Sequence, residues 1–237
     1  MSSTTWTASE LKSNAGNYEA DAWRFVESQY LIATASLVDS VAEQSQLEQL
    51  LEGSKPALLS EFDGFHTLLA TPFRYRSTIS SRFRSSNMPG VFYCAELLDT
   101  AAAEMAFHRW RFLTDSVELL RLSPTSYTAF QAKIKGLTAD LTQEPFIQDT
   151  KMWKHKSDFQ KTQEFASVAS EASVGVIRYE SVRDPKHGAC LAVLSAAGFG
   201  SRQPLANSQS WVLSVSRDRA LWVNRQETIE FQADFWN

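Results

Sequence analysis

The C-terminal part of the chain is a series of short apolar runs separated by turn residues, and this pattern limits the fold more than any other. The runs are four to seven residues long, with Gly, Pro, Asn and Asp between them, and they cover residues 174–179, 189–195, 210–216, 220–223 and 228–232. Runs of this length between turn signals are typical of β-strands. They predict a predominantly antiparallel or mixed sheet.

The N-terminal part has a helical pattern instead. Apolar residues recur at steps of three and four from Glu19 to Leu51, with a break near residues 39–45 that can divide the segment into two helices. Gly53 then supplies a signal for the end of the helix. Residues 1–18 are polar, and we expect them to be poorly ordered.

Strands and helices alternate in the middle of the chain. Residues 66–76 contain Pro72, which disfavours helix, so this segment is predicted to be extended. Asp99 or Thr100 can cap a helix that runs to about Leu113, with Thr100 and Glu104 close to a capping arrangement. Three further elements are predicted, namely a strand over 91–95, a strand over 126–137 and a helix over 159–172.

Helices in front and strands behind indicate an α+β fold. A chain of 237 residues is long enough for one large domain with an appended helical region. We therefore predict a helical region over residues 1–60 that packs on a core formed by residues 61–237. Packing on its own core is the more common role of such a region, although an amphipathic helix can also bind a partner.

Composition and charge exclude several classes of protein. The net charge of −4 argues against direct nucleic-acid binding, which usually needs a basic surface. No apolar run approaches the length of about 20 residues that spans a membrane. The polar N-terminus lacks the apolar core of a signal peptide. These features predict a soluble, cytoplasmic protein without membrane contact.

Cysteine and histidine are too few and too scattered to indicate a metal centre. Cys94 and Cys190 each stand in or beside an apolar run, which is typical of buried, reduced thiols. His187 lies three residues before Cys190, but no second pair completes a tetrahedral set. We expect no metal site.

Four residues in two blocks form the candidate site. Arg82 precedes a turn, Tyr93 lies in the next predicted strand, and Glu104 lies about one turn into the following helix. Ser181 stands at the end of a C-terminal strand. Each has a structural alternative: a solvated arginine, a core tyrosine, a helix-capping glutamate and a turn serine. From the residue types alone, surface ion pairs remain the more common explanation for such charges.

Two ordered blocks of the sequence resemble the RES-domain family, whose members are toxins of bacterial toxin–antitoxin pairs. The first block is "TPFRYRSTISSRFRSSNMPGVFYCAELLDTAAAEMAFHR", in which Arg82-Phe83, Tyr93 and Glu104 match the family's motif residues. The second block is "VIRYESVRDPKHGACLAVLS", in which Ser181 matches the motif serine. The helical flank before the first block also looks like that of a longer subgroup, so the resemblance covers most of residues 23–200.

The resemblance departs from the family at two positions beside the motif residues. Ser81 stands where many members have Gly, and Glu180 stands where a smaller residue or proline is common. Neither change removes a motif residue. Glu180 does add a charge close to Ser181, which puts the binding properties of that position in doubt.

The resemblance implies an ADP-ribosyltransferase-like fold, with a split mixed β-sheet that holds NAD in a cleft between its halves. On this interpretation residues 61–237 are the RES catalytic domain. The family also implies cleavage of the bond between nicotinamide and ribose, by phosphorolysis or hydrolysis. It implies neutralisation by an Xre-type helix-turn-helix antitoxin. A homodimer is a further possibility that the sequence leaves open.

The chemistry of this bond assigns a role to each motif residue. Nicotinamide leaves as a neutral molecule from a cationic substrate, so one carboxylate can suffice where ordinary glycosidases commonly need two. Glu104 is expected to hold the ribose 2′-hydroxyl and stabilise the developing cation, and Arg82 to bind the diphosphate. Tyr93 is expected to offer its ring to nicotinamide or its ribose, and Ser181 a hydrogen bond to the ribose or the carboxamide.

The remaining substrate contacts and the acceptor are less closely defined. Phe83, Arg74 and Arg76 are further candidates for substrate binding, and Arg84 is another candidate beside the acceptor, which is phosphate or water. NAD is expected as a substrate and not as a retained cofactor, because the chain has neither a GxGxxG motif nor a P-loop. Two alternatives stay open: an ADP-ribosyltransferase that modifies a protein, and a non-catalytic interaction module.

Overall fold

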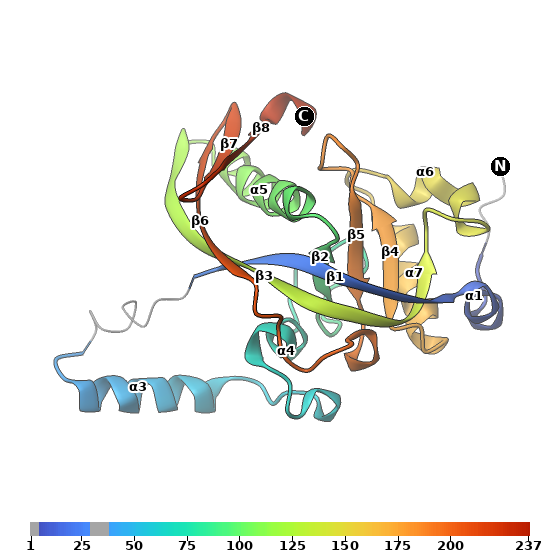
Figure 1. The fold of residues 1–237 in the computed structure, drawn as a ribbon, viewed down its shortest axis with the longest axis horizontal. Coiled ribbons are helices and arrows are strands. Elements are labelled where there is room, and N and C mark those ends of the chain that lie inside the picture. Colours follow the sequence, from blue (N-terminus) through green and yellow to red (C-terminus); the bar gives the residue numbers. More distant parts are fainter. Residues whose placement is uncertain (1–4, 29–37) are drawn as a thin grey trace.

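The computed structural model describes residues 5–28 and 38–237, which form one eight-stranded mixed sheet with helices around it (Figure 1). The strands are hydrogen-bonded in the order β1-β2-β5-β4-β3-β6-β7-β8, and β1 also pairs with β3. Their bounds are Gly16–Glu27 (β1), Phe92–Ala95 (β2), Arg121–Asp140 (β3), Val176–Glu180 (β4), Ala189–Val193 (β5), Ser208–Ser216 (β6), Arg219–Val223 (β7) and Thr228–Gln232 (β8). The predicted α+β class with a mixed sheet is confirmed.

The helices lie on both sides of this sheet and at its ends. In the described part of the chain they are α1 (Ala8–Asn14), α3 (Val41–Ser54), α4 (Thr67–Arg74), α5 (Leu98–Asp115), α6 (Thr150–Trp153) and α7 (Gln160–Glu171). Helix α5 lies between strands β6–β8 on one side and strands β4 and β5 on the other (Figure 1). Helix α3 is drawn apart from the sheet, at the lower left of Figure 1.

The long strand β3 belongs to both halves of the sheet. It pairs with β6 over residues 121–130 and with β4 over residues 138–140, where the strands are parallel. Strand β1 runs antiparallel to β3 from the pair Gly16–Thr138 to the pair Glu27–Tyr127. It also contacts β2 at Trp23–Ala95. The sheet therefore splits at β3 into a half with β6–β8 and a half with β2, β5 and β4, and α5 packs between them.

Small residues let α5 lie close to the strands. Ala102, Ala103 and Ala106 have no exposed surface, and they belong to the larger of two apolar clusters. The second cluster is on the other face of the β2–β5–β4 half, where Phe62 stacks on Phe73 with ring centroids 4.1 Å apart. Burial of each large side chain contributes about 1.5–3 kcal/mol, so the two clusters supply much of the driving force for folding.

The helix predicted from Glu19 is wrong over its first part, because residues 16–27 form strand β1. Ala22 and Phe25 are both buried although they point to opposite faces of the strand. A strand that is buried on both faces loses its alternation, and its apolar residues then recur at helix-like intervals. The predicted helical residues 29–37 lie outside the described part of the chain, whereas helix α3 agrees with the prediction.

Two other local predictions are also wrong. Residues 8–14 form helix α1, which the capping box of Thr7 and Glu10 begins and the fully buried Leu11 anchors. Residues 67–74 form helix α4 despite Pro72, which lies in its last turn. A side chain on Gly90 would overlap the carbonyl oxygen of Pro72, with its Cβ 1.6 Å from that atom. The Pro-Gly turn thus packs directly on this helix end.

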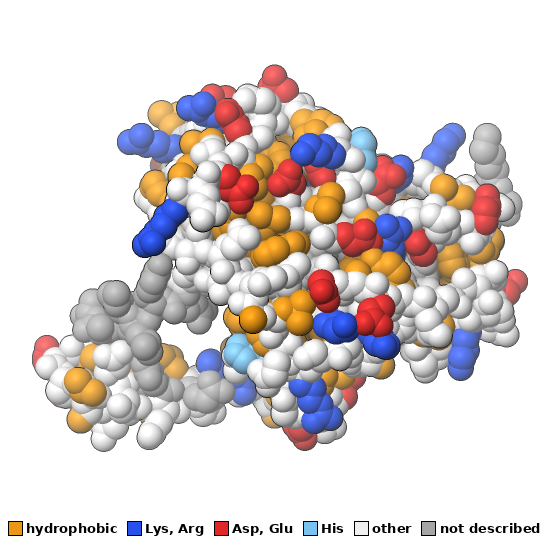
Figure 2. Space-filling model, in the orientation of Figure 1, with side chains coloured by type: hydrophobic (Ala, Val, Ile, Leu, Met, Phe, Trp, Pro, Cys, Tyr) orange, Lys and Arg blue, Asp and Glu red, His pale blue; other side chains and the backbone are white. Residues whose placement is uncertain are grey.

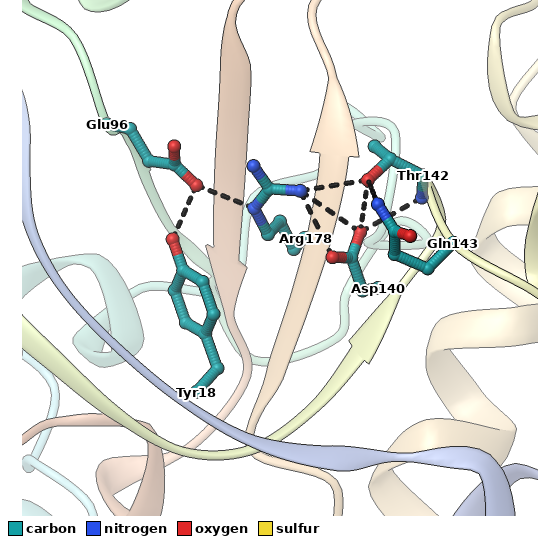
Figure 3. Close-up of polar contacts among 6 residues, drawn as sticks. All are labelled: Tyr18, Glu96, Asp140, Thr142, Gln143 and Arg178. Carbon is teal, nitrogen blue, oxygen red and sulfur yellow. Dashed lines mark hydrogen bonds and ion pairs between the residues drawn. The ribbon is translucent and has the colours of Figure 1, made fainter.

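A polar cluster on β4 ties four strands together on the face away from α5 (Figure 3). Arg178 donates from Nε to Glu96 at 2.6 Å and from Nη1 to Asp140 at 3.1 Å. Thr142 accepts a third hydrogen bond from Arg178 at 2.8 Å, and the hydroxyl of Tyr18 donates to Glu96. These residues stand on or beside β1, β2, β3 and β4, and we call them the Arg178 cluster. The cluster fixes the position of β4 and of the residues that follow it.

The surface carries charges of both signs. Figure 2 shows acidic and basic side chains interspersed on the face of the molecule that is seen in Figure 1. They surround hydrophobic side chains that gather between the two halves of the sheet.

Among residues 5–28 and 38–237, no helix is long and apolar enough to cross a membrane. The division at residue 60 between a helical region and a catalytic domain stays a prediction.

Candidate active site

A cavity of about 350 Å³ lies between α5 and the β2–β5–β4 half of the sheet. Helix α5 contributes Glu104, Phe107 and His108, and the strands contribute Tyr93 and Tyr179. Its charged lining consists of Arg24, Arg82, Arg183 and Glu104. The split of the sheet thus creates a basic cavity with one carboxylate in its wall.

Glu104 points away from the end of its helix and toward β4. Ser181, which is fully buried, donates a hydrogen bond of 2.5 Å to Oε1 of Glu104. The thiol of Cys190 lies 3.8 Å from the same oxygen. The predicted capping role of Thr100 is wrong, because its hydroxyl instead donates to Asp184 at 2.7 Å and α5 begins without a side-chain cap.

Ser181 is held by the loop after β4. Its hydroxyl oxygen accepts hydrogen bonds from the backbone N–H groups of Arg183 and Asp184, at 3.1 and 3.0 Å. Its backbone N–H donates to the carbonyl of Gly188 at 2.9 Å. The serine therefore lies behind Glu104 as its support and is not part of the cavity lining, whereas a hydrogen bond from it to the ribose or the carboxamide was predicted.

Tyr93 joins strand β2 to the loop that carries Arg82. Its hydroxyl shares a hydrogen bond of 2.8 Å with Ser81 and accepts one of 3.1 Å from the backbone N–H of Phe83. Burial is the main cause of a raised pKa of Tyr93, so the phenol stays neutral at physiological pH. The ring of Tyr93 forms part of the cavity wall.

Arg82 is a largely buried cation at the other side of the same loop. Its Nη1 donates to the carbonyl of Trp153 at 2.6 Å, and its guanidinium lies 4.8 Å from the ring centroid of Phe159. The backbone carbonyl of Arg82 accepts a hydrogen bond from Thr162 in α7. Helices α6 and α7 thus fix the position of this arginine in the cavity wall.

Two arginines of the cavity were not predicted from the sequence. Arg24 comes from β1, where it donates from Nη1 to the carbonyl of Tyr93 at 2.6 Å, and its buried Nε has no hydrogen-bond partner. Arg183 lies on the face of Phe107, 3.7 Å from the ring centroid. Arg24 was missed because a helix was predicted for its segment. Arg183 stands two residues after the motif residue Ser181, and this short spacing could have identified it as a site residue.

Titratable groups around the cavity are shifted toward their neutral forms. Burial raises the pKa of Tyr179 and of Cys190 well above their ordinary values, and nearby Glu104 adds to the effect at both. The surrounding protein lowers the pKa of His108, although water reaches its side chain through the cavity and Glu104 opposes the shift. At neutral pH the lining therefore carries three positive charges and one negative charge.

Three of the predicted site residues, Arg82, Tyr93 and Glu104, line one cavity, and Ser181 contacts Glu104 from behind it. Phe83 is buried beside this group and packs against Tyr179 with ring centroids 4.9 Å apart.

The other predicted arginines lie outside the cavity lining. Arg74 donates to the carbonyl of Pro56, and Arg76 donates to the carbonyl of Asn87 at 3.3 Å. Arg84 donates to the carbonyl of Ile79. These three arginines stabilise loops in this structure, and Arg24 and Arg183 occupy the cavity wall instead.

The cysteines are free and buried, as predicted. Among the described residues, no three His, Cys, Asp or Glu side chains come together in a way that would hold a metal ion. The cavity offers guanidinium groups, one carboxylate and aromatic rings, and this combination suits an anionic ligand with a planar ring.

Comparisons with known proteins place this architecture in a family. A chain of "Crystal structure of the M.tuberculosis MbcT-MbcA toxin-antitoxin complex" is similar in fold, with a TM-score of 0.51 at 7% sequence identity, over 97% of this chain and 93% of that one. No curated protein sequence matches the chain. The model of the RES domain matches residues 59–216, which is more than half of the 237 residues. The chain therefore belongs to the RES-domain family.

Proposed function

We propose that this protein is the toxin of a type II toxin–antitoxin pair and that it degrades NAD by cleaving the bond between nicotinamide and ribose. The observation that carries the proposal is the single carboxylate of Glu104 in a cavity whose other charges are three arginines. The NAD diphosphate has two negative charges, and the cavity has a net charge of +2 when His108 is neutral. The charges of substrate and cavity are therefore complementary.

The chemistry of the bond explains why one carboxylate is enough. As the bond between C1′ and the ring nitrogen breaks, its electron pair goes to the nitrogen, and nicotinamide leaves uncharged. No acid is needed for the leaving group, and the ribose acquires positive charge at C1′. Glu104 stabilises that charge and accepts a hydrogen bond from the ribose 2′-hydroxyl, since a carboxylate that is fixed in position beforehand acts strongly on a developing cation.

The other motif residues bind and position the substrate. Arg82 binds the diphosphate with its forked guanidinium, and the ring of Tyr93 packs on nicotinamide or its ribose. Ser181 orients the carboxylate of Glu104 through the hydrogen bond between them. Phe83 contributes by holding the Tyr93 hydroxyl with its backbone N–H. NAD is a substrate here and no cofactor is retained; phosphate or water is the acceptor.

The partner of the toxin follows from its family and from the similar structure, whose title describes a toxin–antitoxin complex. We propose an Xre-type helix-turn-helix antitoxin that covers or enters the cavity. The pair works in the cytoplasm, where NAD is available. This chain needs neither a membrane nor direct contact with nucleic acid for that activity, and a homodimer is compatible with it.

An ADP-ribosyltransferase that modifies a protein is the second candidate, because the same bond and the same kind of cavity serve both reactions. Ile79, which lines the cavity, is an exposed apolar side chain and can contact a protein acceptor. A non-catalytic interaction module explains the buried arginines and the Ser181–Glu104 contact less well, since buried unpaired charge is costly without a ligand.

Incubation of the purified protein with NAD, with and without a cell extract that supplies acceptor proteins, followed by mass analysis, separates these functions. The proposal predicts free nicotinamide together with a soluble ADP-ribose product, in amounts that exceed the enzyme by many turnovers. Labelling of a protein with ADP-ribose, without a soluble product, identifies the second candidate. Unchanged NAD at high enzyme concentration contradicts both, and leaves the interaction module.

A further inference from the structure

The segment that follows β8 supports one wall of the candidate active site from behind. It forms a short 3₁₀ helix, Ala233–Phe235, and Trp236 comes directly after it. In Figure 1 this red segment lies beside the loop that joins β4 to β5. Trp236 is only 5% exposed and does not line the cavity, but it contacts two residues that do, Phe107 and Arg183.

Three residues from separate segments form a closed ring of hydrogen bonds. The indole Nε1 of Trp236 donates to the backbone carbonyl of Arg183 at 2.8 Å. Nη2 of Arg183 donates to the backbone carbonyl of Lys156, which lies between α6 and α7. Nζ of Lys156 donates in turn to the carbonyl of Asn237 at 3.1 Å and to that of Phe235 at 3.5 Å, on either side of Trp236. We call Lys156, Arg183 and Trp236 the Trp236 clasp.

Aromatic packing holds this clasp against α5. The ring of Trp236 meets that of Phe107 edge to face, with centroids 6.0 Å apart, and lies 5.7 Å from that of Trp110. The guanidinium of Arg183 lies 3.7 Å from the centroid of the same Phe107 ring. Edge-to-face pairs and cation–π contacts each favour one arrangement, so Trp236 and Arg183 are fixed relative to a common ring of the helix.

The clasp holds a cation near the carboxylate of Glu104 without an ion pair between them. Phe107 follows Glu104 by about one turn of α5, so the guanidinium on Phe107 lies beside the turn that carries the carboxylate. Burial lowers the pKa of Arg183 to about 10, against the attraction of Glu104, so the group is a cation at neutral pH. Within residues 5–28 and 38–237, no ion pair joins the two charges. Other contacts must therefore hold Arg183 in place, and the clasp supplies them.

We propose that Trp236 and Lys156 are positioning residues of the active site, because the clasp keeps the Arg183 guanidinium on Phe107 and away from Glu104. Once the clasp is broken, the guanidinium is free to pair with the carboxylate, whose charge is then lost to the cation that develops at C1′. The inference rests on the proposed function, since the expected loss is one of catalytic rate. Trp236 lies beyond residue 216, where the match to the RES domain ends, so the inference extends the site past the family's domain.

The test compares kcat and KM for nicotinamide release between the wild type and variants of the clasp. Trp236→Phe keeps an aromatic ring but removes the donor to Arg183, and Lys156→Met removes Nζ but keeps the backbone carbonyl that Arg183 binds. Each should lower kcat at least fivefold and leave the KM for NAD within threefold of the wild type. Lys156→Arg keeps a donor and should retain most of the wild-type kcat. Wild-type kcat in both Trp236→Phe and Lys156→Met overturns the inference.

Trp6→Phe is the matched control. It also removes an indole hydrogen bond, to Asp149, and neither residue lines the cavity. Its kcat and KM should match those of the wild type. A fall in kcat as large as that of Trp236→Phe would show that any lost indole bond has this effect, and would contradict a specific role for the clasp.

A double-mutant cycle shows whether Trp236 acts through Arg183. Arg183→Gln leaves no guanidinium to be released, so adding Trp236→Phe to it should change kcat less than twofold. A merely structural role of Trp236 would lower kcat by the same factor in both backgrounds, and that result would overturn the inference.

Nuclear magnetic resonance of the arginine side chains tests the clasp without NAD. In protein labelled with ¹⁵N-arginine, the signal of Arg183 is the one that Arg183→Gln lacks. Its side-chain N–H protons should exchange with water at least tenfold faster in Trp236→Phe than in the wild type, and Trp6→Phe should show no change. This result supports the clasp even if the wild type releases no nicotinamide, which would contradict the proposed function alone. Unchanged exchange at Arg183 in both Trp236→Phe and Lys156→Met overturns the inference while NAD cleavage stands.

Discussion

The hydroxyl of Ser181 donates a hydrogen bond of 2.5 Å to the carboxylate of Glu104, across 77 residues of sequence. The two residues come from separate sequence blocks, and the fold brings them together because Ser181, which directly follows β4, lies beside α5. The carboxylate is thus fixed by a buried serine and does not collapse onto the cavity arginines. Fixing a charge in advance of the reaction is the usual way in which enzymes stabilise a developing cation.

Ser181→Ala tests this support. A hydrogen bond to a charged group contributes about 1.5–3 kcal/mol, so kcat for nicotinamide release should fall by about 10- to 100-fold while the KM for NAD stays within threefold. The loss of stability should be about 1–2 kcal/mol, because two backbone N–H groups lose their acceptor. Ser170→Ala removes a hydroxyl hydrogen bond within α7 and is the control. A wild-type kcat in Ser181→Ala would show that Glu104 does not depend on this serine.

Tyr93→Phe separates the hydroxyl from the ring. The ring remains in the cavity wall, but Ser81 and the N–H of Phe83 lose their partner. We expect the free energy of unfolding in urea to fall by about 1–1.5 kcal/mol and kcat/KM to fall less than tenfold. Tyr93→Ala also removes the ring and should lower kcat/KM at least tenfold further. Equal activity of the two variants would contradict a role for the ring in binding.

The Arg178 cluster should make stability depend on pH at both ends of the range. Partial burial alone raises the pKa of Glu96, but the hydrogen bonds from Arg178 and Tyr18 outweigh it, and the net shift is downward from 4.5. The contribution of Glu96 is therefore complete above pH 4.5 and is lost as pH falls through its folded pKa. Burial, and then Glu96, raise the pKa of Tyr18 to about 12, so its contribution is lost as pH rises above 10.

Arg178→Met removes most of this dependence. At pH 7 we expect the free energy of unfolding to fall by about 2–3 kcal/mol, less than for a fully buried pair because the side chains keep 19–29% exposure. Between pH 6 and pH 3.5 the variant should lose less stability than the wild type. Arg219→Met breaks an exposed pair with Glu230 and should change stability by less than about 0.5 kcal/mol. Parallel pH curves for wild type and Arg178→Met would contradict the role of the cluster.

The two cysteines should be inert in the folded protein. Burial raises the pKa of Cys94 to about 12 and that of Cys190 well above its ordinary value, so the reactive thiolate is scarce at pH 8. A disulfide reagent should modify both thiols in the urea-unfolded protein. In the native protein, without urea, the same reaction should be at least about 100-fold slower. Fast modification of one thiol in the native protein would mean that its environment opens in solution.

The sequence predicted the elements whose patterns depend on local signals. Strands β4 to β8 and helices α5 and α7 lie where turn residues and periodicity indicated them. The strand β1 was missed because Ala22 and Phe25 are buried on opposite faces, so the apolar period of two that marks a half-exposed strand is absent. Helix α4 was missed because Pro72 is tolerated near a helix end that Gly90 contacts.

The site was only partly accessible from the sequence. Glu104 and Ser181 were grouped through the family resemblance, whereas periodicity alone assigned a cap to one and a turn to the other. Arg24 reaches the cavity through the pairing of β1 with β3, and a long-range pairing of this kind leaves no local pattern. Arg183 reaches it from the loop after β4, where only its spacing from Ser181 could have identified it. Conversely, Arg74 and Arg76 have the right residue type but bind backbone carbonyls of nearby loops.

The most direct test of NAD cleavage through Glu104 is the rate of nicotinamide release from NAD by the wild type, Glu104→Gln and Glu118→Gln. Glu118 is an exposed glutamate after α5, so its variant controls for the loss of a charge. We predict multiple turnovers for the wild type and Glu118→Gln, and a rate at least about 100-fold lower for Glu104→Gln with the same circular dichroism spectrum. A wild-type rate in Glu104→Gln, or no nicotinamide from the wild type, would contradict this mechanism.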